Sequence, residues 1–431
     1  ITGGTSSVTG ISVNFDGGTT TATGNSVFNL SGGSTITGFS IGATGAGTTN
    51  VSQNTIHTLS GTGTLTVTGI LCSGGIRNIF RNKVYNIQNS NASGAAHGIT
   101  VSSGTTITVH NNLIGDIRTP AANAANPLIG LNITGGTTIN VFYNTVYLNG
   151  RSTGALFGSS AISVSTTPTV TLRNNIFVNN STANGAGFTV AHRRSSTALG
   201  TYAATSNNNL FFANAPCTSS LIFFDGTNAD QTLTAYKARV AARDAASVTE
   251  DPNFISTSGA SANFLHVNTA IATQIEAGAN DIAGITVDFD GDARNATTPD
   301  IGADEFNGVA AVACAGTPNA GTASVAISPI CSGQTATVCL SGQTPPSGIR
   351  VQWQSGPSAV GPFTDVSCAG ANCYTTGSLT PGSYFYQAVV TCDNSGLTAT
   401  SNVVEVVVNP NPTITIDPTS LTICSGTGDS L

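Results

Sequence analysis

Hydrophobic residues recur along the first half of the chain with two superimposed periods. Over short stretches, such as 98–101 and 107–109, valine and isoleucine alternate with threonine and other small or polar residues. Alternation of this kind is typical of β-strands with one buried face. On a longer scale, an asparagine returns roughly every 30 residues and is followed two residues later by an aliphatic residue. The copies begin at Asn25, Asn54, Asn82, Asn112, Asn144, Asn174 and Asn208.

Three short strands in each repeat predict an all-β fold, with one coil of a right-handed parallel β-helix per repeat. The amphipathic helices that a TIM barrel or a doubly wound sheet would need between its strands are missing from this stretch. Two aliphatic columns are expected to stack in the core of the solenoid. The first is Val51, Ile79, Val109 and Val141, and the second is Val27, Ile56, Val84, Ile114, Val146, Ile176 and Leu210.

The recurrent asparagine has two interpretations. At equivalent turns of stacked coils, its amide can donate and accept hydrogen bonds along the solenoid axis, which forms a ladder with a spacing of about 4.8 Å. Alternatively, an exposed row of asparagines could bind sugar. The ladder is the favoured interpretation.

From about residue 216 the period breaks and a closing segment begins. Residues 230–243 suit one short amphipathic helix, and three motifs follow at 251–254, 288–294 and 299–306. Together these features resemble the closing segment of right-handed β-helix proteins that gliding-type bacteria export. The resemblance covers residues 1–306 and implies the solenoid fold and export, with the type IX route as one option. It implies no particular activity, because such solenoids serve as lyases, adhesins and passive stalks.

The C-terminal part of the chain predicts a different domain. Residues 307–320 form a linker of small residues, and Trp353 lies in a strand between two cysteine-bearing strands within 321–408. This arrangement resembles an immunoglobulin-like β-sandwich of the kind found in large surface proteins of the same bacteria. Residues 423–426 repeat residues 330–333, so 409–431 are expected to be the first strands of a further module or a strand exchanged with a neighbouring subunit.

Composition limits the compartment and the partners. Only 8% of residues are charged and the net charge is −7, which argues against binding nucleic acid or an anionic membrane surface. No apolar run is long enough to span a bilayer. The chain begins at Ile1 and contains no methionine, so we expect a mature or excised segment whose export signal lies outside it.

Nine cysteines, most of them after residue 313, indicate disulfides and an oxidising, extracellular or cell-surface location. Among the pairings that the C-terminal cysteines allow, we favour a bond across the sandwich, a local clip, and the pair left by elimination. These pairs are Cys331 with Cys392, Cys368 with Cys373, and Cys314 with Cys339.

One cluster of acidic residues suggests an ion. Asp288, Asp290 and Asp292 alternate around a glycine, and Asp300, Asp304 and Glu305 follow. Hard oxygen ligands on a bent backbone suit a structural calcium, although the spacing is not that of an EF-hand. The alternative is a turn that pairs with Arg294 and caps the solenoid. No other cofactor is expected.

No catalytic constellation is evident in the sequence. The acids and bases of residues 1–215 mostly fall in different coils, so neither a lyase nor a glycosidase pair can be assembled. Residues 192–194, His-Arg-Arg, are a candidate contact for an acidic glycan. The favoured function is therefore a structural or adhesive surface protein, a stalk or fibre subunit that contacts copies of itself or other surface proteins. The alternative is a carbohydrate-active or glycan-binding β-helix.

Overall fold

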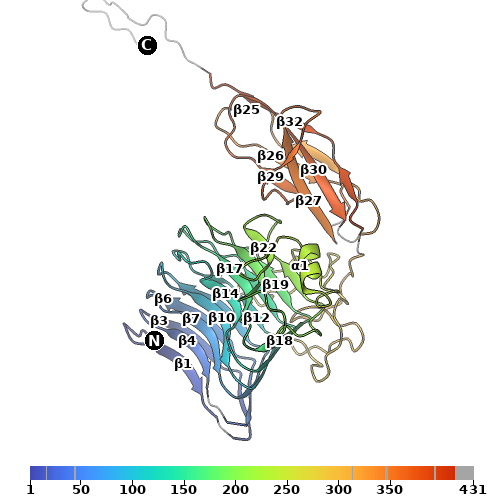
Figure 1. The fold of residues 1–431 in the computed structure, drawn as a ribbon. Helices are drawn as coiled ribbons and strands as arrows, with labels where there is room; N and C mark the ends of the chain where they lie inside the picture. The colour runs from blue at the N-terminus through green and yellow to red at the C-terminus, as the bar shows by residue number, and fades with distance from the viewer. Residues whose placement is uncertain (16, 43–44, 313, 345–347, 393–394, 413–431) are drawn as a thin grey trace, which may run out of the picture.

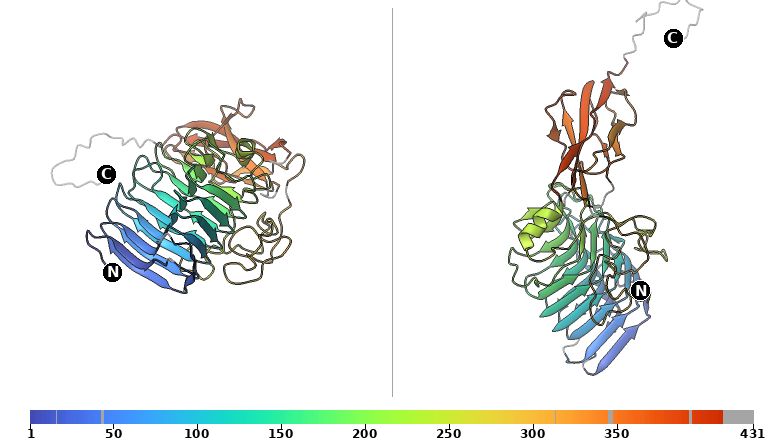
Figure 2. Two further views of the ribbon diagram at one scale, coloured as in Figure 1. Left: turned by 60° about the horizontal axis from the view of Figure 1, so that its bottom comes forward. Right: turned by 90° about the vertical axis from the view of Figure 1, so that its right-hand side faces the viewer.

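The computed structural model of the protein describes residues 1–15, 17–42, 45–312, 314–344, 348–392 and 395–412. Over these residues the chain is nearly all β, as predicted (Figure 1). A parallel solenoid spans residues 8–224, a closing segment covers its last coils, and an antiparallel domain follows. The antiparallel domain lies beyond the end of the solenoid that is farther from the N-terminus (Figures 1 and 2).

Each of the first six coils contributes a strand to each of three sheets, and the last coils add strands to the first and third sheets only. The first sheet contains β1 (Val8–Val13), β4 (Ile36–Ile41), β7 (Val67–Ser73), β10 (Ala96–Ser103), β14 (Leu128–Ile133), β17 (Ser159–Val164), β20 (Thr189–Arg194), β22 (Ser220–Phe224) and the antiparallel β23 (Ala229–Asp230). The second contains β2 (Thr19–Thr23), β5 (Thr48–Ser52), β8 (Ile76–Phe80), β11 (Thr106–His110), β15 (Thr138–Phe142) and β18 (Thr169–Arg173). The third contains β3 (Ser26–Gly32), β6 (Thr55–Gly61), β9 (Lys83–Asn89), β12 (Leu113–Gly115), β13 (Ile117–Arg118), β16 (Thr145–Leu148), β19 (Ile176–Asn179) and β21 (Leu210–Phe212).

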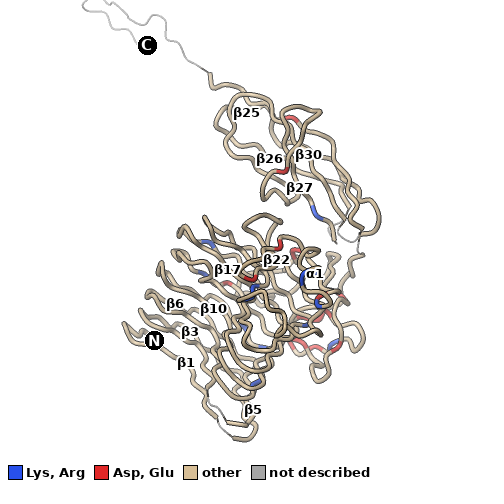
Figure 3. Tube along the Cα trace, viewed as in Figure 1, with Lys and Arg blue, Asp and Glu red and all other residues tan. Residues whose placement is uncertain are grey.

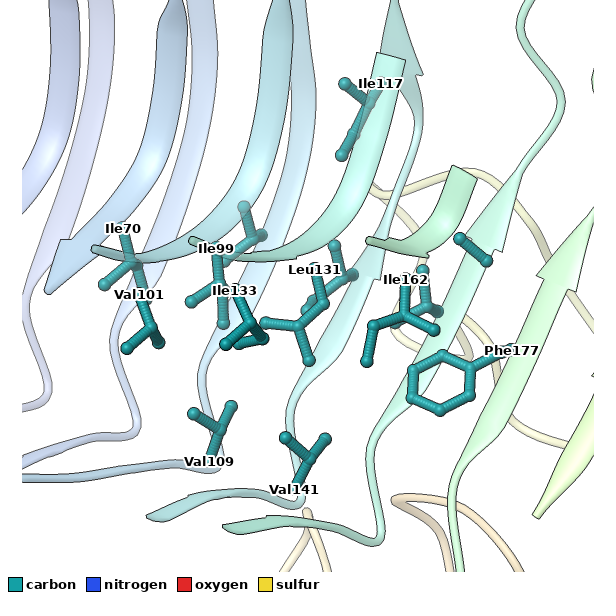
Figure 4. Close-up of a cluster of buried hydrophobic side chains, with 14 of the residues drawn as sticks. Ile70, Ile99, Val101, Val109, Ile117, Leu131, Ile133, Val141, Ile162 and Phe177 are labelled. Carbon is teal, nitrogen blue, oxygen red and sulfur yellow. The ribbon is translucent and has the colours of Figure 1, made fainter. Parts of the chain in front are cut away.

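The core of the solenoid is a stack of aliphatic side chains from all three sheets (Figure 4). The predicted column of the second sheet is confirmed, because Val51, Ile79, Val109 and Val141 pair in register and are fully buried. Glycines in the first sheet leave space for aliphatic side chains of the third sheet. A Cβ added at Gly98 would lie 2.4 Å from Cγ2 of Ile114, closer than any real contact.

The second predicted column is correct for five members and wrong for two. Val27, Ile56, Val84, Ile114 and Val146 stack in the core. In the next coils, however, Phe177 pairs with Val146 and Phe211 pairs with Phe177. Ile176 and Leu210 are buried in a separate cluster, beneath the closing segment. A shift of one residue sends a strand side chain to the opposite face of the sheet.

The asparagine ladder is confirmed and is buried from Asn54 onward, so the row is not a sugar-binding surface. Each amide nitrogen Nδ2 donates to Oδ1 of the asparagine in the next coil at 2.8–3.0 Å, and each backbone N–H donates to the same oxygen at 2.9–3.2 Å. The members are Asn25, Asn54, Asn82, Asn112, Asn144, Asn175 and Asn209. The ladder ends on Asp244 and Ser247 of the closing segment.

Asn174 and Asn208 were therefore assigned one position too early. Both have a left-handed backbone, with φ of 60° and 56°, at the corner that precedes each ladder asparagine. Their amides instead donate to the carbonyl oxygens of Asn280, at 2.7 Å, and Gly278, at 2.9 Å. These two corner residues thus hold the closing segment against the solenoid.

The closing segment contains α1 (Leu233–Val240), the only α-helix among the described residues. The hydroxyl of Thr232 caps it by accepting from the N–H of Ala235. Tyr236 and Val240 face the core of the last coils and are fully buried. The helix therefore covers the end of the hydrophobic core, which would otherwise be exposed to water.

The antiparallel domain consists of two sheets. One contains β24 (Thr322–Val325), β26 (Thr337–Ser341) and β29 (Cys373–Thr375); the other contains β25 (Ile330–Cys331), β32 (Val404–Asn409), β30 (Gly382–Cys392), β27 (Ile349–Gly356), β28 (Thr364–Asp365) and β31 (Thr398–Thr400). All strand pairs are antiparallel except β25 with β32. Trp353 is fully buried in its core, and its Nε1 donates to the carbonyl oxygen of Ala371 at 2.9 Å. Of the predicted strand segment 409–431, residues 413–431 lie outside the described residues.

Candidate functional sites around the closing segment

Charged residues are few along the first coils and are more frequent in the closing segment (Figure 3). The basic trio at 192–194 is not a surface patch for acidic glycans. His192 and Arg194 are almost fully buried. Nε of Arg193 donates to Oγ of Ser160 at 2.8 Å, and its guanidinium lies over the ring of Phe224. Burial lowers the pKa of His192 well below its usual value, so it packs as a neutral ring.

The three aspartates proposed for calcium do not form one cluster. Asp288 is fully buried, and its Oδ1 accepts from the N–H groups of Gly291 and Asp292 at 2.8 Å each. Its other oxygen accepts from the N–H of Glu305 at 2.9 Å. Asp288 therefore shapes the loop, while the backbone occupies both of its oxygens. Asp292 is exposed to solvent. Calcium binding by these residues stays a prediction.

Arg294 anchors this loop, but its partner is not one of the three aspartates. Its Nη1 lies 3.0 Å from Oε2 of Glu305, and its Nη2 donates to Oδ1 of Asn111 in the solenoid at 2.8 Å. The guanidinium carbon lies 3.9 Å from the centre of the Tyr143 ring. The predicted pairing of Arg294 with the aspartate turn is therefore wrong; Arg294 instead fastens the closing segment to the solenoid through Glu305 and Asn111.

The loop does bring one group of metal-ligating side chains together. Among the described residues, His266, Asp290 and Asp304 each place a ligand atom within 4.8 Å of the other two. Nε2 of His266 lies 2.7 Å from Oδ2 of Asp290 and 3.9 Å from Oδ1 of Asp304. The hydrogen bond to Asp290 raises the pKa of His266, and burial raises the pKa of Asp304 to about 6. Asp290 was a predicted ligand; His266, which lies 24 residues earlier, was missed.

A cavity of about 360 Å³ lies between the closing end of the solenoid and the antiparallel domain, and both parts line it. Glu250 and Asp251 line it from the closing segment, and Arg350 lines it from β27. Burial raises the pKa of both carboxyl groups. Glu250 accepts from the N–H of Gln274 at 3.1 Å, and Asp251 accepts from Nδ2 of Asn180 at the same distance. The 251–254 motif gave no sign of a site in the sequence, because part of the cavity wall belongs to another domain.

The predicted disulfide pairings are wrong. The described residues form the bonds Cys217–Cys368, Cys314–Cys392 and Cys339–Cys373. Cys331 is exposed on the edge strand β25 and has no disulfide partner among the described residues, whereas Cys392 is fully buried. Cys339 and Cys373 face each other in register on neighbouring strands. The prediction is wrong because it assumed that every bond joins cysteines of the C-terminal part, whereas Cys217 of the solenoid bonds to Cys368.

Replacing both Cys217 and Cys368 with serine is expected to loosen the antiparallel domain from the solenoid. This bond joins residues that are 151 positions apart and directly connects the two folded parts. Small-angle X-ray scattering should then report a broader distribution of maximum dimensions. The matched control replaces Cys339 and Cys373, which lie within the antiparallel domain. Identical scattering from both variants would contradict the role of Cys217–Cys368 as an interdomain clamp.

Comparison with known proteins identifies one part of the chain. Residues 319–410 match the model of a family described as a domain of unknown function, DUF8696. This match covers the strands from β24 to β32 and leaves out the solenoid and its closing segment. No curated protein and no solved structure matches the chain. The described residues contain no helix of the length and hydrophobicity needed to cross a membrane.

Proposed function

We propose that this chain is part of a structural or adhesive protein of the extracellular surface, a stalk or fibre subunit. In this proposal the solenoid is a stiff rod, and the antiparallel domain, interpreted as an immunoglobulin-like spacer, extends it. The observation that carries the proposal is the unbroken ladder of amides from Asn25 to Asn209, buried from Asn54 onward, beside a continuous aliphatic core. Bending such a rod would break hydrogen bonds in several coils at once.

Two further observations support an extracellular location and a role without catalysis. Three disulfides within the described residues are typical of an oxidising compartment. Several charged groups on the solenoid are engaged structurally, as in the ion pair between Arg118 and Asp116 and the bond from Lys83 to the carbonyl oxygen of Ser261. Export by a type IX route and the relation to surface proteins of gliding-type bacteria remain part of the proposal, as do partners such as copies of this chain or other surface proteins.

Surface labelling tests the location. Antibodies raised against residues 8–224 are expected to label intact cells that produce the protein. Brief treatment of those cells with protease should remove the label, because an exposed rod would be cut from the surface. Labelling that appears only after the cells are lysed would contradict the proposal.

Glycan binding is the second candidate function, and the interdomain cavity favours it. Two carboxylates, several amides and the apolar side chains of Phe212 and Leu233 line this cavity. Polar groups beside apolar surface suit the hydroxyls and the carbon face of a sugar. Binding to an array of neutral oligosaccharides should fall at least tenfold in Glu250→Gln and stay unchanged in Glu405→Gln, which alters an exposed residue of β32. Absence of binding by the unmodified chain would leave the structural role alone.

A further inference from the structure

Three separate turns of the closing segment converge on one small site. His266 follows the fully buried Phe264 and Leu265, and its own carbonyl oxygen accepts from the N–H of Ile255 at 2.8 Å. Asp304 follows the buried Ala303, whose carbonyl oxygen accepts from the N–H of Phe289 at 2.8 Å. The three side chains thus project from backbone that is already held in place.

The loop of Asp290 is also tied to the solenoid. Nε of Arg81 donates to the carbonyl oxygen of Phe289 at 2.8 Å. The carboxylate of Asp288 accepts two backbone N–H groups of the turn that follows. Preorganised ligands bind a metal more tightly, since little freedom is lost on binding. The site therefore has the rigid frame that a metal centre needs.

The site contains more acidic than basic side chains, which favours the binding of a cation. Two carboxylates face one imidazole, and the side chain of Asp304 is only 13% exposed. The nearby ammonium of Lys83 donates to the carbonyl oxygen of Ser261 at 2.7 Å and lies over the rings of Tyr85 and Phe264. A second cation between the carboxylates and the imidazole would offset the repulsion between the two acids.

The ligand set and its dimensions fit a transition metal better than calcium. A tetrahedral zinc ion has bonds of about 2.0–2.2 Å, which places its ligand atoms roughly 3.4 Å apart. The distances from Nε2 of His266 to the two carboxylates, 2.7 and 3.9 Å, lie on either side of that value. The Asp290 side chain is 45% exposed and has room to adjust. Calcium, in contrast, prefers six to eight oxygen ligands and seldom uses imidazole.

We propose that His266, Asp290 and Asp304 bind one divalent transition metal ion of the zinc class. The ion would join three turns of the closing segment, and because Arg81 and Arg294 bind these turns to the solenoid, it would stabilise the cap. The fourth coordination position would be taken by water on the exposed side of Asp290. This proposal does not depend on the surface role proposed above.

The experiment uses the full chain with Cys331 and Cys424 replaced by serine, so that neither position can offer a thiolate to the ion. After treatment with EDTA and dialysis, zinc chloride is titrated in a calorimeter and bound metal is counted by mass spectrometry. We expect one zinc ion per chain. Asp304→Asn and Asp290→Asn should each weaken binding at least tenfold. The control is Asp292→Asn, an exposed aspartate of the same loop, which should bind zinc like the parent.

A second measurement separates a metal site from a simple ion pair between His266 and Asp290. Cobalt(II) bound in place of zinc should give the visible absorption bands of a tetrahedral centre, and Asp304→Asn should abolish them. Circular dichroism will show whether each variant is folded. The proposal is wrong if folded Asp304→Asn and Asp292→Asn bind zinc equally, if the parent binds none, or if it selects calcium over zinc.

Discussion

Replacing Ile114 with aspartate is expected to unfold the central coils of the solenoid. Ile114 is fully buried, and its Cγ2 approaches Gly98 on the opposite sheet so closely that no other side chain fits between them. The substitution removes an apolar contact worth about 1.5–3 kcal/mol and buries a carboxyl group without a partner. A total loss of about 4 kcal/mol or more would be a large share of the stability of a typical domain. Urea unfolding measures this loss, and hydrogen exchange should locate it between β8 and β16.

The matched control changes the outward face of the same coil. Thr108 lies on β11, is only half-buried, and pairs with Asn78 and Asn140 of the neighbouring coils. Thr108→Asp adds the same charge where water can solvate it, so stability should change by only about 0.5 kcal/mol. Equal losses in the two variants would mean that the assignment of inner and outer faces is wrong.

Replacing Asn112 with aspartate is expected to break the amide ladder at its centre. Nδ2 of Asn112 donates to the carbonyl oxygens of Ile79 and His110 and to Oδ1 of Asn144, at 2.8–2.9 Å. Aspartate has nearly the same shape but only acceptors, so it would place a negative oxygen against three others in a buried site. We expect a loss of about 3 kcal/mol or more, because each unsatisfied buried group costs about 1–3 kcal/mol.

Asn140→Asp is the control for the ladder variant. Asn140 is also an asparagine of the central coils, but it lies half-buried on the outer face of β15 rather than in the ladder. Its substitution should leave the midpoint of thermal unfolding nearly unchanged. If Asn112→Asp and Asn140→Asp unfold at the same temperature, the ladder contributes no more to stability than a surface amide does.

The sequence was sufficient to predict the coils, because their signal is local and repeated. Alternation with a period of two identifies a strand with one buried face, and its return in each coil identifies the stack. For the same reason, both aliphatic columns were correct through Val141 and Val146. The assignment was wrong in the following coils, at the asparagine pairs 174–175 and 208–209. The first asparagine of each pair is followed two residues later by an aliphatic residue and so matches the motif, whereas the actual ladder member is followed by phenylalanine. The backbone, with a left-handed corner at the first asparagine of each pair, shows which residue anchors the closing segment and which belongs to the ladder.

The candidate sites were predictable only in part. The acidic loop was identified, and Asp290 is a member of the cluster found there. His266 was missed because nothing in its neighbourhood along the chain marks it as a ligand. The cavity and the bond between Cys217 and Cys368 join parts of two domains, and no periodic pattern relates them.

By itself, then, the sequence determined that this protein is a parallel β-solenoid with a closing segment and a cysteine-rich β domain after it. The solenoid and the β domain follow from hydrophobic alternation, repeat length and cysteine content, which are local or repeated signals, and the closing segment follows from the resemblance of its motifs. The tertiary structure alone decided which asparagines form the ladder, which cysteines bond, and which carboxylates meet His266. Each of these depends on the position of one side chain relative to another that is far away in sequence. A shift of a single residue in a strand reverses the face on which that side chain lies.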